Sequence, residues 1–553
     1  MIRVAFIFCV FAVSVATQAA TPSSPAKSNA QDAAPQRRPL RQILIAEGLE
    51  NAQRLDPLPD AGFLVIAPPL EAKHLKVLEP KLIAARNRLI DEPLLASIAQ
   101  VIEVHFRQND LPLACALIPP QSIGEGAIRV ALLPGKIRHI RFEGNRWFSD
   151  SLLRAKLKIE EGQIFRLSAI EKSINWANSS SFRNIRMHLQ PVANTGEVDV
   201  QVGVTEQAPW RVFAALDNSG NDLLGERRLT FGATAGNLWA SDHQFTYQHI
   251  TTDFSQIFQA HVFEYRAPLP WRHTLSVSGS VLRANPSFFE GLFTQKGRSL
   301  TADLRYSLSL WRNLWRFDFS GGISAKQTNN NLEYGGTPVL GSTLDSFTFV
   351  LGGTALREDS RGRTILGASF TTSPGNLNRR NADQLFNESR LGAKSRFSLL
   401  QVNIERVTRL APDTASLLKV GGQLAAGNLI PAEQLSLGGS STVRGYKERL
   451  LTGDHGYMAS HELHWKIRAP KISKKGPPIE TAGIGFWDFG RNFIHTPLPS
   501  ERRSDYLASA GLGMRITMAN ILSISLDHAW QLEKVELPGE RPYRTHFRMM
   551  VSF

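Results

Sequence analysis

The sequence predicts two small α+β units followed by a transmembrane β-barrel of about sixteen antiparallel strands. Three observations lead to this fold class. The chain of 553 residues opens with a stretch typical of a secretory signal. Residues 62–206 then mix helical and strand patterns, and residues 209–553 show strand alternation alone. Beyond the signal no stretch is apolar for long enough to form a transmembrane helix, so a membrane location requires a closed barrel.

Residues 1–20 are predicted to be a cleaved signal peptide. Arg3 precedes an apolar run, Val4–Ala16, and small residues follow it. The alternative is a membrane anchor, but this run is too short to span a bilayer. Cys9 lies inside the signal, which leaves Cys115 as the single cysteine of the mature chain and excludes an intrachain disulfide.

The composition favours strands and turns over a large helical enzyme, because only 20% of the residues are charged and there are 42 glycines. The net charge of +14 alone would suggest a nucleic-acid partner. Lys and Arg are dispersed, however, with no basic helix and no aromatic-stacking motif, so no nucleic acid is predicted. A basic surface facing anionic outer-membrane lipids accounts for the same charge.

Residues 21–61 are predicted to be a leader that contains one short helix. The first part is rich in Ala, Pro, Ser and Gln, as flexible segments are. Residues 40–54 place Leu40, Ile43, Leu44 and Leu49 on roughly one helical face. This stretch is predicted to be a helix, either frayed on the surface or with a role of its own.

Two similar units are predicted at residues 62–136 and 137–206. In the first, Asp91 can cap a helix that begins near Pro93, and short strands follow at 113–118 and 127–133. The second has a strand, helices near 149–157 and 167–178, and two closing strands. The last strand alternates clearly, with Val198, Val200, Val202 and Val204 on one side. The two units form a weak internal repeat.

Residues 209–553 alternate apolar and polar side chains, as the strands of a membrane barrel with a wet interior do. A soluble β-sandwich would bury the same apolar face. The signal peptide, the uninterrupted length of strand pattern and the aromatic residues near strand ends favour the barrel. Those aromatic residues are Trp239, Trp271, Trp311, Trp315 and Trp530. The polar stretches 327–346 and 374–394 are predicted to be long external loops.

A glycine-rich loop at about 428–456 interrupts this pattern and contains the sequence LGGSSTVRGY. Within this sequence, Val443, Gly445 and Tyr446 lie next to its one arginine, Arg444. A later strand reads GFWDFG from Gly485 to Gly490. Alternation in that strand points Phe486 and Asp488 to one face and Trp487 and Phe489 to the other. We expect Asp488 to face the lumen, with Phe486 beside it.

Several motifs together resemble a known family. The barrel entrance carries Asp217-Asn218-Ser219-Gly220, Gly225, Arg228, Gly236-Asn237-Leu238 and Asp242. The VRGY loop is followed by Glu448 and Gly453-Asp454-x-Gly456, and later strands carry Glu462, the GFWDFG sequence and Ser509-Ala510-Gly511-Leu512-Gly513. In this combination the chain resembles the two-partner secretion transporters of the ShlB/FhaC/HecB type (TpsB). Their superfamily also contains outer-membrane assembly factors.

The resemblance implies that the two small units are periplasmic POTRA domains and that a 16-stranded barrel lies in the outer membrane. It implies that the VRGY loop folds into the lumen and that Arg444 forms a latch with Asp488, a pairing that suits a planar fork and a carboxylate. The alternative is two unrelated charges. The implied function is export of a partner exoprotein (TpsA-like), unfolded and without ATP, by a protein expected to be monomeric.

Two details depart from the family pattern or extend it. By its position, the helix at residues 40–54 resembles the N-terminal plug helix of these transporters. The first POTRA-like unit carries Ala116-Leu117-Ile118-Pro119-Pro120-Gln121 where the family usually has an R-x-x-x-P-x-Q-like stretch. The usual Arg is missing, which bears on cargo contacts at this place.

Other chemistry is not indicated. His461-Glu462-Leu463-His464 has the wrong spacing for a metal-binding H-E-x-x-H motif, and in a strand its two His point to opposite faces. There is no G-x-S-x-G elbow. No catalytic residue, metal site or cofactor is predicted. The alternative functions are an assembly factor for other barrels or, with less support, a passive porin or adhesin. The exported protein itself could be a haemolysin, an adhesin, a contact-dependent toxin or a protease.

Overall fold

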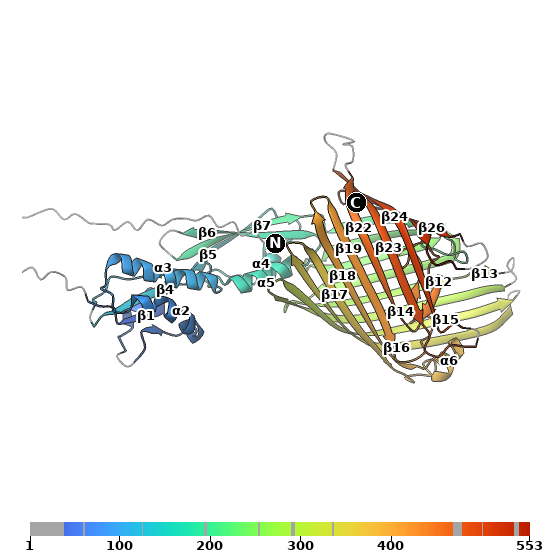
Figure 1. Ribbon diagram of the computed structural model, residues 1–553, viewed down its shortest axis with the longest axis horizontal. Coiled ribbons are helices and arrows are strands. Elements are labelled where there is room, and N and C mark those ends of the chain that lie inside the picture. The colour runs from blue at the N-terminus through green and yellow to red at the C-terminus, as the bar shows by residue number, and fades with distance from the viewer. Residues whose placement is uncertain are drawn as a thin grey trace, which may run out of the picture. The chain divides into compact units, whose positions relative to one another are not determined.

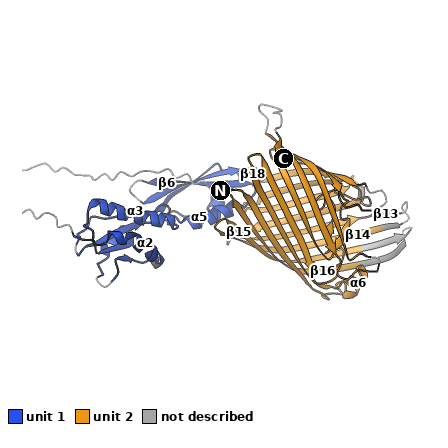
Figure 2. Ribbon diagram, viewed as in Figure 1, with its two compact units in different colours: residues 1–207 blue, residues 208–553 orange. Residues whose placement is uncertain are grey.

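The computed structural model describes residues 38–58, 61–123, 125–192, 196–252, 255–288, 293–334, 337–467, 478–499, 501–535 and 541–553. The predicted signal peptide and the first part of the leader lie outside these ranges. The chain forms two compact units, residues 1–207 and 208–553 (Figure 2). The first contains two small sheets with their helices, and the second is the barrel. No helix in the described ranges is long and apolar enough to cross a membrane.

The first sheet has the strand order β2-β1-β4-β3, with β1 in the interior, parallel to both neighbours. Its strands are β1 (Gln42–Glu47), β2 (Leu64–Ile66), β3 (Cys115–Leu117) and β4 (Ala127–Leu133). The helices are α1 (Leu49–Arg54), η1 (Ala72–His74), α2 (Leu75–Leu82), η2 (Ile83–Ala85) and α3 (Glu92–Gln108). Helix α3 begins as predicted, because the Asp91 side chain accepts a hydrogen bond of 2.9 Å from the Leu94 amide.

The prediction of one helix at residues 40–54 is wrong. This stretch forms β1 and the short α1, and Ile43, Leu44 and Ile45 are fully buried. A short apolar run fits a buried strand as well as a helical stripe, so periodicity alone does not separate the two. As a consequence the first small domain already includes residues 42–47, ahead of the predicted start at 62. Residues 42–47, part of the stretch whose position resembles a plug helix, form an interior strand of a folded domain.

The second sheet has the order β5-β7-β6, with β5 parallel and β6 antiparallel to β7. Its elements are β5 (Lys136–Glu143), α4 (Asp150–Leu157), α5 (Leu167–Ala177), β6 (Arg183–Val192) and β7 (Glu197–Glu206). The four valines of β7 are buried against the helices, as their alternation predicted. This order of elements matches the predicted strand–helix–helix–strand–strand unit.

The second unit is a closed barrel of sixteen antiparallel strands, with the two-residue β13 (Ser287–Phe288) set beside β14 (Figure 1). This confirms the predicted fold class. The strands are β8 (Trp210–Asp217), β9 (Arg228–Leu238), β10 (His243–Thr252), β11 (Ser255–Pro268), β12 (His273–Ala284), β14 (Phe293–Arg312), β15 (Trp315–Tyr334), β16 (Thr337–Asp359), β17 (Gly362–Pro374), β18 (Arg396–Ala411), β19 (Thr414–Ala425), β22 (His455–Ile467), β23 (Ile479–Phe493), β24 (Ser504–Met518), β25 (Leu522–Gln531) and β26 (Tyr543–Ser552).

The barrel closes where β26 pairs with β8, from Arg548 opposite Asp217 to Ser552 opposite Phe213. Phe553 continues the seam by exchanging two backbone hydrogen bonds with Val212. Short turns join most strands at the end where β8 begins. Longer connections lie at the opposite end, which we call the mouth, and one of them carries α6 (Asp383–Ser389).

The two predicted external loops differ in outcome. Residues 375–395 do form a connection at the mouth, between β17 and β18. Residues 327–346, in contrast, belong largely to β15 and β16, so the prediction of a long loop there is wrong. Thr and Asn side chains suit a loop, but they suit the polar face of a barrel strand equally well, and composition does not distinguish the two.

Candidate functional site in the barrel lumen

The connection between β19 and β22, residues 426–454, folds back as a hairpin. Strands β20 (Leu435–Leu437) and β21 (Leu451–Gly453) form its stem. The tip, residues 438–450, turns on Gly438, Gly439 and Gly445, whose φ angles of 102°, 99° and 93° favour glycine. Glu448 braces the tip by accepting hydrogen bonds of 2.8 and 3.0 Å from the Ser440 amide and hydroxyl. Burial raises the pKa of the Glu448 carboxyl.

Arg444 lies at the tip and is 4% exposed, and Asp488 on β23 is fully buried. The two residues form a planar fork: Arg444 Nε donates to Asp488 Oδ2 over 2.7 Å, and Nη2 donates to Oδ1 over 2.8 Å. The Arg444 backbone amide donates to the same Oδ2 over 3.1 Å. This arrangement fixes both the side chain and the backbone of the tip on one carboxylate.

Two further carboxylates approach the same guanidinium. Arg444 Nη1 lies 2.9 Å from Glu462 Oε1 on β22 and 3.5 Å from Asp527 Oδ2 on β25. Asp527 is shared with Arg515 of β24, at 2.6 and 2.8 Å. Burial alone would lower the pKa of the Arg444 guanidinium, but the hydrogen bond to Asp488 and the surrounding carboxylates raise it. Each buried charge therefore has an opposite partner.

Phe486 completes the cluster on the lumenal side of β23. The centre of the Arg444 guanidinium lies 3.5 Å from the centroid of its ring, close enough for a cation–π contact. Ser460 of β22 donates to Asp488 Oδ1 over 2.7 Å. Trp487, between Phe486 and Asp488 in sequence, points outward and is 44% exposed. The alternation predicted for this strand is thus confirmed.

The residues beside Arg444 anchor the tip to the same wall. The Gly445 amide donates to His546 Nε2 over 3.1 Å, and the Gly445 carbonyl accepts from Gln531 Nε2 over 2.9 Å. The Tyr446 hydroxyl donates to backbone carbonyls, with Ala508 at 2.7 Å. Tyr446 is fully buried, and it packs in an apolar cluster with Leu437, Val443 and Leu507.

The two glycines of the predicted strand motif have different positions. Gly490 faces the tip, where a Cβ atom would lie 2.9 Å from Leu437 Cδ2 and 3.0 Å from Val443 Cγ2. Gly485 is not part of the lumenal site, since its nearest neighbour would be Trp465 at 3.7 Å, on the outer face. Asp488, Phe486 and Gly490 therefore meet the loop, and Gly485 does not.

Sequence reasoning missed Glu462 and Asp527 as partners of Arg444. Their signal was available, because each is an acidic residue at a lumen-facing position of its strand. Glu462 also binds His464 over 2.7 Å on the same face. Within the described ranges, no group of three or more His, Cys, Asp or Glu side chains could hold a metal ion.

Two regions of the chain match family models of known proteins. Residues 196–516, more than half of the chain, match the family described as haemolysin secretion/activation protein ShlB/FhaC/HecB. The chain belongs to this family. Residues 135–207 match the POTRA model, described as a surface antigen variable number repeat, which agrees with the sheet β5-β7-β6.

Individual family members are distant in sequence. The chain is 24% identical over 418 residues to the outer membrane transporter CdiB-2 of Burkholderia pseudomallei, covering 72% of this chain and 67% of that protein. It is 22% identical over 468 residues to the heme/hemopexin transporter protein HuxB of Haemophilus influenzae, covering 79% and 77%. The solved structure of CdiB from Escherichia coli superposes with a TM-score of 0.75 at 17% identity, covering 95% and 93% of the two chains.

Membership of the family gives the location and the class of this ShlB/FhaC/HecB-type protein. It is an outer-membrane β-barrel of a transporter family, with its POTRA region in the periplasm. The mouth of the barrel, at the end opposite the start of β8, accordingly faces the cell exterior.

Proposed function

We propose that this transporter exports a partner exoprotein, which it binds through its periplasmic domains and passes unfolded through the barrel lumen without ATP. In this proposal the loop tip is a latch, held by Arg444 and Asp488, that controls the conducting path. The observation that carries the proposal is the buried fork between these two residues, at 2.7 and 2.8 Å, on a loop that has no covalent link to β23.

A latch must be strong when closed and able to open as one piece. The Arg444 fork satisfies the first condition, because breaking one partner of a buried charge pair costs about 3–5 kcal/mol. The hairpin geometry satisfies the second, because the stem is the only covalent link between the tip and the barrel. Water along the path would also stabilise the separated charges once the tip moves away.

Recognition of the cargo is assigned to the sheet edges of the first unit. Strands β3 and β6 are both at the edge of their sheets, where an extended segment of the exoprotein can add as a further strand. Near β3, the Gln121 side chain accepts from the Arg129 amide over 2.7 Å and donates to its carbonyl over 2.9 Å. Gln121 thus fills a pairing position on β4 just beyond β3. We also assign the first sheet to a POTRA domain.

We assign the driving force for outward transport to folding of the exoprotein outside the cell. The sequence has no Walker A loop, and the periplasm lacks ATP. A cargo that folds on emerging cannot return through the lumen. This part of the proposal is tested with a cargo segment altered so that it cannot fold. Normal export of that segment would refute the folding-driven step.

The function as a whole is tested in two stages. The proteins of the culture medium are first compared with and without this transporter, which identifies the exoprotein by its loss. A fragment of residues 38–207 is then used in a binding assay. A fragment starting at 62 would lack β1, one of the two interior strands of the first sheet. Binding to the amino-terminal domain of the lost exoprotein supports export. Binding to unfolded barrel proteins instead would support an assembly factor.

A further inference from the structure

A second set of contacts lies at the mouth of the barrel, away from Arg444. It joins three connections: residues 375–395 with α6, the first arm of the loop at 426–434, and residues 494–503. Its polar centre is formed by Arg390, Asn428 and Asp454, which we call the mouth clamp. Asp454 is fully buried and Asn428 is 6% exposed. Charged and amide groups at such burial require partners, and the clamp supplies them across the three connections.

Asp454 is the residue through which most of these contacts pass. Its Oδ1 accepts hydrogen bonds from the Leu429 amide over 2.9 Å and from Gln434 Nε2 over 3.2 Å. Its Oδ2 accepts from the His495 amide over 2.8 Å and lies 3.9 Å from Arg390 Nη2. One carboxylate therefore joins the loop arm, the segment after β23 and the loop with α6.

Asn428 and Arg390 connect the same three segments by further hydrogen bonds. Asn428 donates to the Leu391 carbonyl and to the Thr496 carbonyl, each over 3.0 Å, and accepts from the Thr496 amide over 2.8 Å. Arg390 Nη1 also donates to Glu501 over 3.4 Å. Each of these bonds of Asn428 and Arg390 joins two different connections, so the clamp depends on how the connections pack at the mouth rather than on any single loop.

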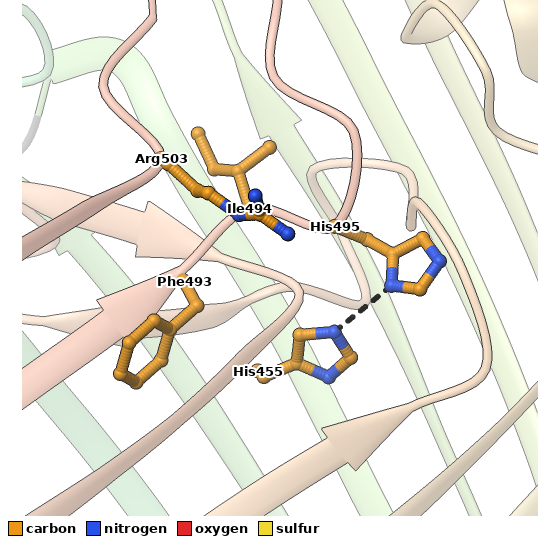
Figure 3. Close-up of a pocket in the computed structure, with 5 residues that line it drawn as sticks. All are labelled: His455, Phe493, Ile494, His495 and Arg503. Carbon is orange, nitrogen blue, oxygen red and sulfur yellow. Dashed lines mark hydrogen bonds between the residues drawn. The ribbon is translucent and has the colours of Figure 1, made fainter.

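A histidine pair extends the clamp on one flank. The Ala425 amide donates to His455 Nδ1 over 3.1 Å, which leaves the hydrogen of that ring on Nε2. His455 Nε2 then donates to His495 Nδ1 over 3.2 Å (Figure 3). The pair borders a pocket of about 380 Å³, together with Phe493, Ile494 and Arg503. It joins the end of β19 to the segment after β23.

An apolar cluster beneath the clamp covers the lumen-facing wall. Phe386 of α6 is fully buried with Leu344 of β16, Leu399 of β18 and Leu429 of the loop arm. Outward residues of the same strands, such as Leu400, are exposed, so Leu399 faces the interior. Deeper in the barrel, the lumen-facing Gln401 and Asn403 of β18 are exposed again. Helix α6 thus covers part of the wall at the mouth, above lumen-facing positions of β18 that are open to solvent.

From this arrangement we propose that Arg390, Asn428 and Asp454 form an exit gate, separate from the Arg444 latch, which holds the mouth closed over β16–β19 until cargo passes. The inference rests on the proposed transport function. The loop at 426–454 is then held at two places, with its tip on β22–β26 and its base in the clamp. Cargo must release both holds in order to leave.

The test is ion conductance of the purified full-length protein in planar bilayers, which requires no cargo. The double variant Arg390→Ala with Asn428→Ala should increase the fraction of time open by about tenfold, equivalent to about 1.4 kcal/mol of lost closed-state contacts. The matched control is Arg379→Ala, which removes an exposed arginine of the same loop that forms no bond to another loop within the described ranges. It should behave as wild type. Barrel folding is checked for each variant by its heat-dependent migration in detergent gels.

An unchanged open time in a folded double variant would overturn the inference, as would an equal increase in Arg379→Ala. If the double variant does not fold, Asn428→Asp decides. It keeps the size of the side chain but turns an oxygen toward the carbonyls of Leu391 and Thr496, so it should also increase opening. The Arg444→Ala variant separates the two proposals. If it conducts and the clamp variants do not, the exit gate fails alone; if none conducts, the conducting path itself is in question.

Discussion

The two walls of the barrel differ in a way that their strands do not explain. Lumen-facing residues of β22–β25, such as Asp488 and Ser509, are fully buried. Lumen-facing residues of β18, such as Gln401 and Asn403, are exposed inside the same barrel. Both walls have the same alternation of inward polar and outward apolar side chains. The difference comes from the loop tip, which lies against one wall only.

For the proposed function, this comparison indicates which wall the cargo would pass. The wall beneath the tip is dry and carries a set of paired charges, so it provides a docking surface for the loop. The wall at β18, two strands away from β22, is wet and polar at mid-barrel, where the lumen-facing Gln401 and Asn403 are exposed. In the proposed function this wall lines the path. At the mouth the relation reverses, because the cluster around Phe386 covers β16–β19. In the proposed exit gate, the path is closed at the mouth by different residues from those that hold the tip.

The largest effect on this comparison is expected from Arg444→Ala. The change leaves Asp488 and Glu462 buried without their cation, at a cost of about 3–5 kcal/mol to the docked tip. The tip should leave the wall, and the exposure of the two walls should become similar. Protease cleavage within residues 438–450 of the folded protein measures this release. Arg444→Lys should give an intermediate result, because it keeps the charge but loses the fork.

Exchanging the charges of Arg444 and Asp488 tests whether the two side chains contact each other directly. Arg444→Asp alone should abolish secretion, and adding Asp488→Arg should restore part of it. Restoration should be incomplete, because a carboxylate at position 444 would face Glu462, which lies 2.9 Å from the present guanidinium. Full secretion by Arg444→Asp alone would show that the contact has no role in export.

A smaller effect is expected from a pair of glycine substitutions on one strand. Gly490→Ala places a methyl group about 3 Å from Leu437 and Val443 at the docked tip, a crowding that typically costs about 1–3 kcal/mol. Gly485→Ala, on the outer face of β23, meets only ordinary contacts of 3.7 Å or more. Thermal unfolding should show a lower melting temperature for Gly490→Ala and little change for Gly485→Ala. Equal melting temperatures would contradict the packing of the tip on β23.

The smallest effect is expected from Asn403→Ala on the exposed wall. The side chain faces water, so its loss should change the free energy of unfolding by less than about 0.5 kcal/mol. Ser509→Leu on the covered wall has no room beneath the tip and should release it. A similar response of both variants, measured by the same protease cleavage, would mean that the two walls are not different.

Much of the barrel was predictable because alternation is a direct consequence of strand geometry. The inward position of Phe486 and Asp488 followed from a period of two. The partners of Arg444 were only partly predictable, because Glu462 and Asp527 come from strands whose neighbours depend on closure of the whole barrel. In the first small domain, the sequence pattern alone did not distinguish a helix from a strand. Leu40, Ile43 and Leu44 fit both a helix and a buried strand, and only the pairing of β1 with β2 and β4 decides between them.

The mouth clamp was not predictable from any local pattern. Asn428 and Asp454 lie at the two ends of the β19–β22 connection and Arg390 lies on the β17–β18 connection, and their bonds depend on where each connection folds over the barrel. The loop at 374–394 was expected from its polar composition, but its burial of Phe386 was not. A single aromatic residue in a polar stretch carries no information about the wall it will cover.

The docking of the loop tip on one wall is tested most directly by thiol accessibility at two lumen-facing positions. In a full-length protein carrying Cys115→Ser, one variant has Asn403→Cys and another has Ser509→Cys, and both are treated with a small water-soluble maleimide. If the loop tip is docked on one wall, we predict rapid labelling at position 403 and protection at position 509. The protection should be lost when Arg444→Ala is added. Equal labelling of both positions with Arg444 intact, or protection at 509 that persists without it, would contradict a loop latched to one wall of the barrel.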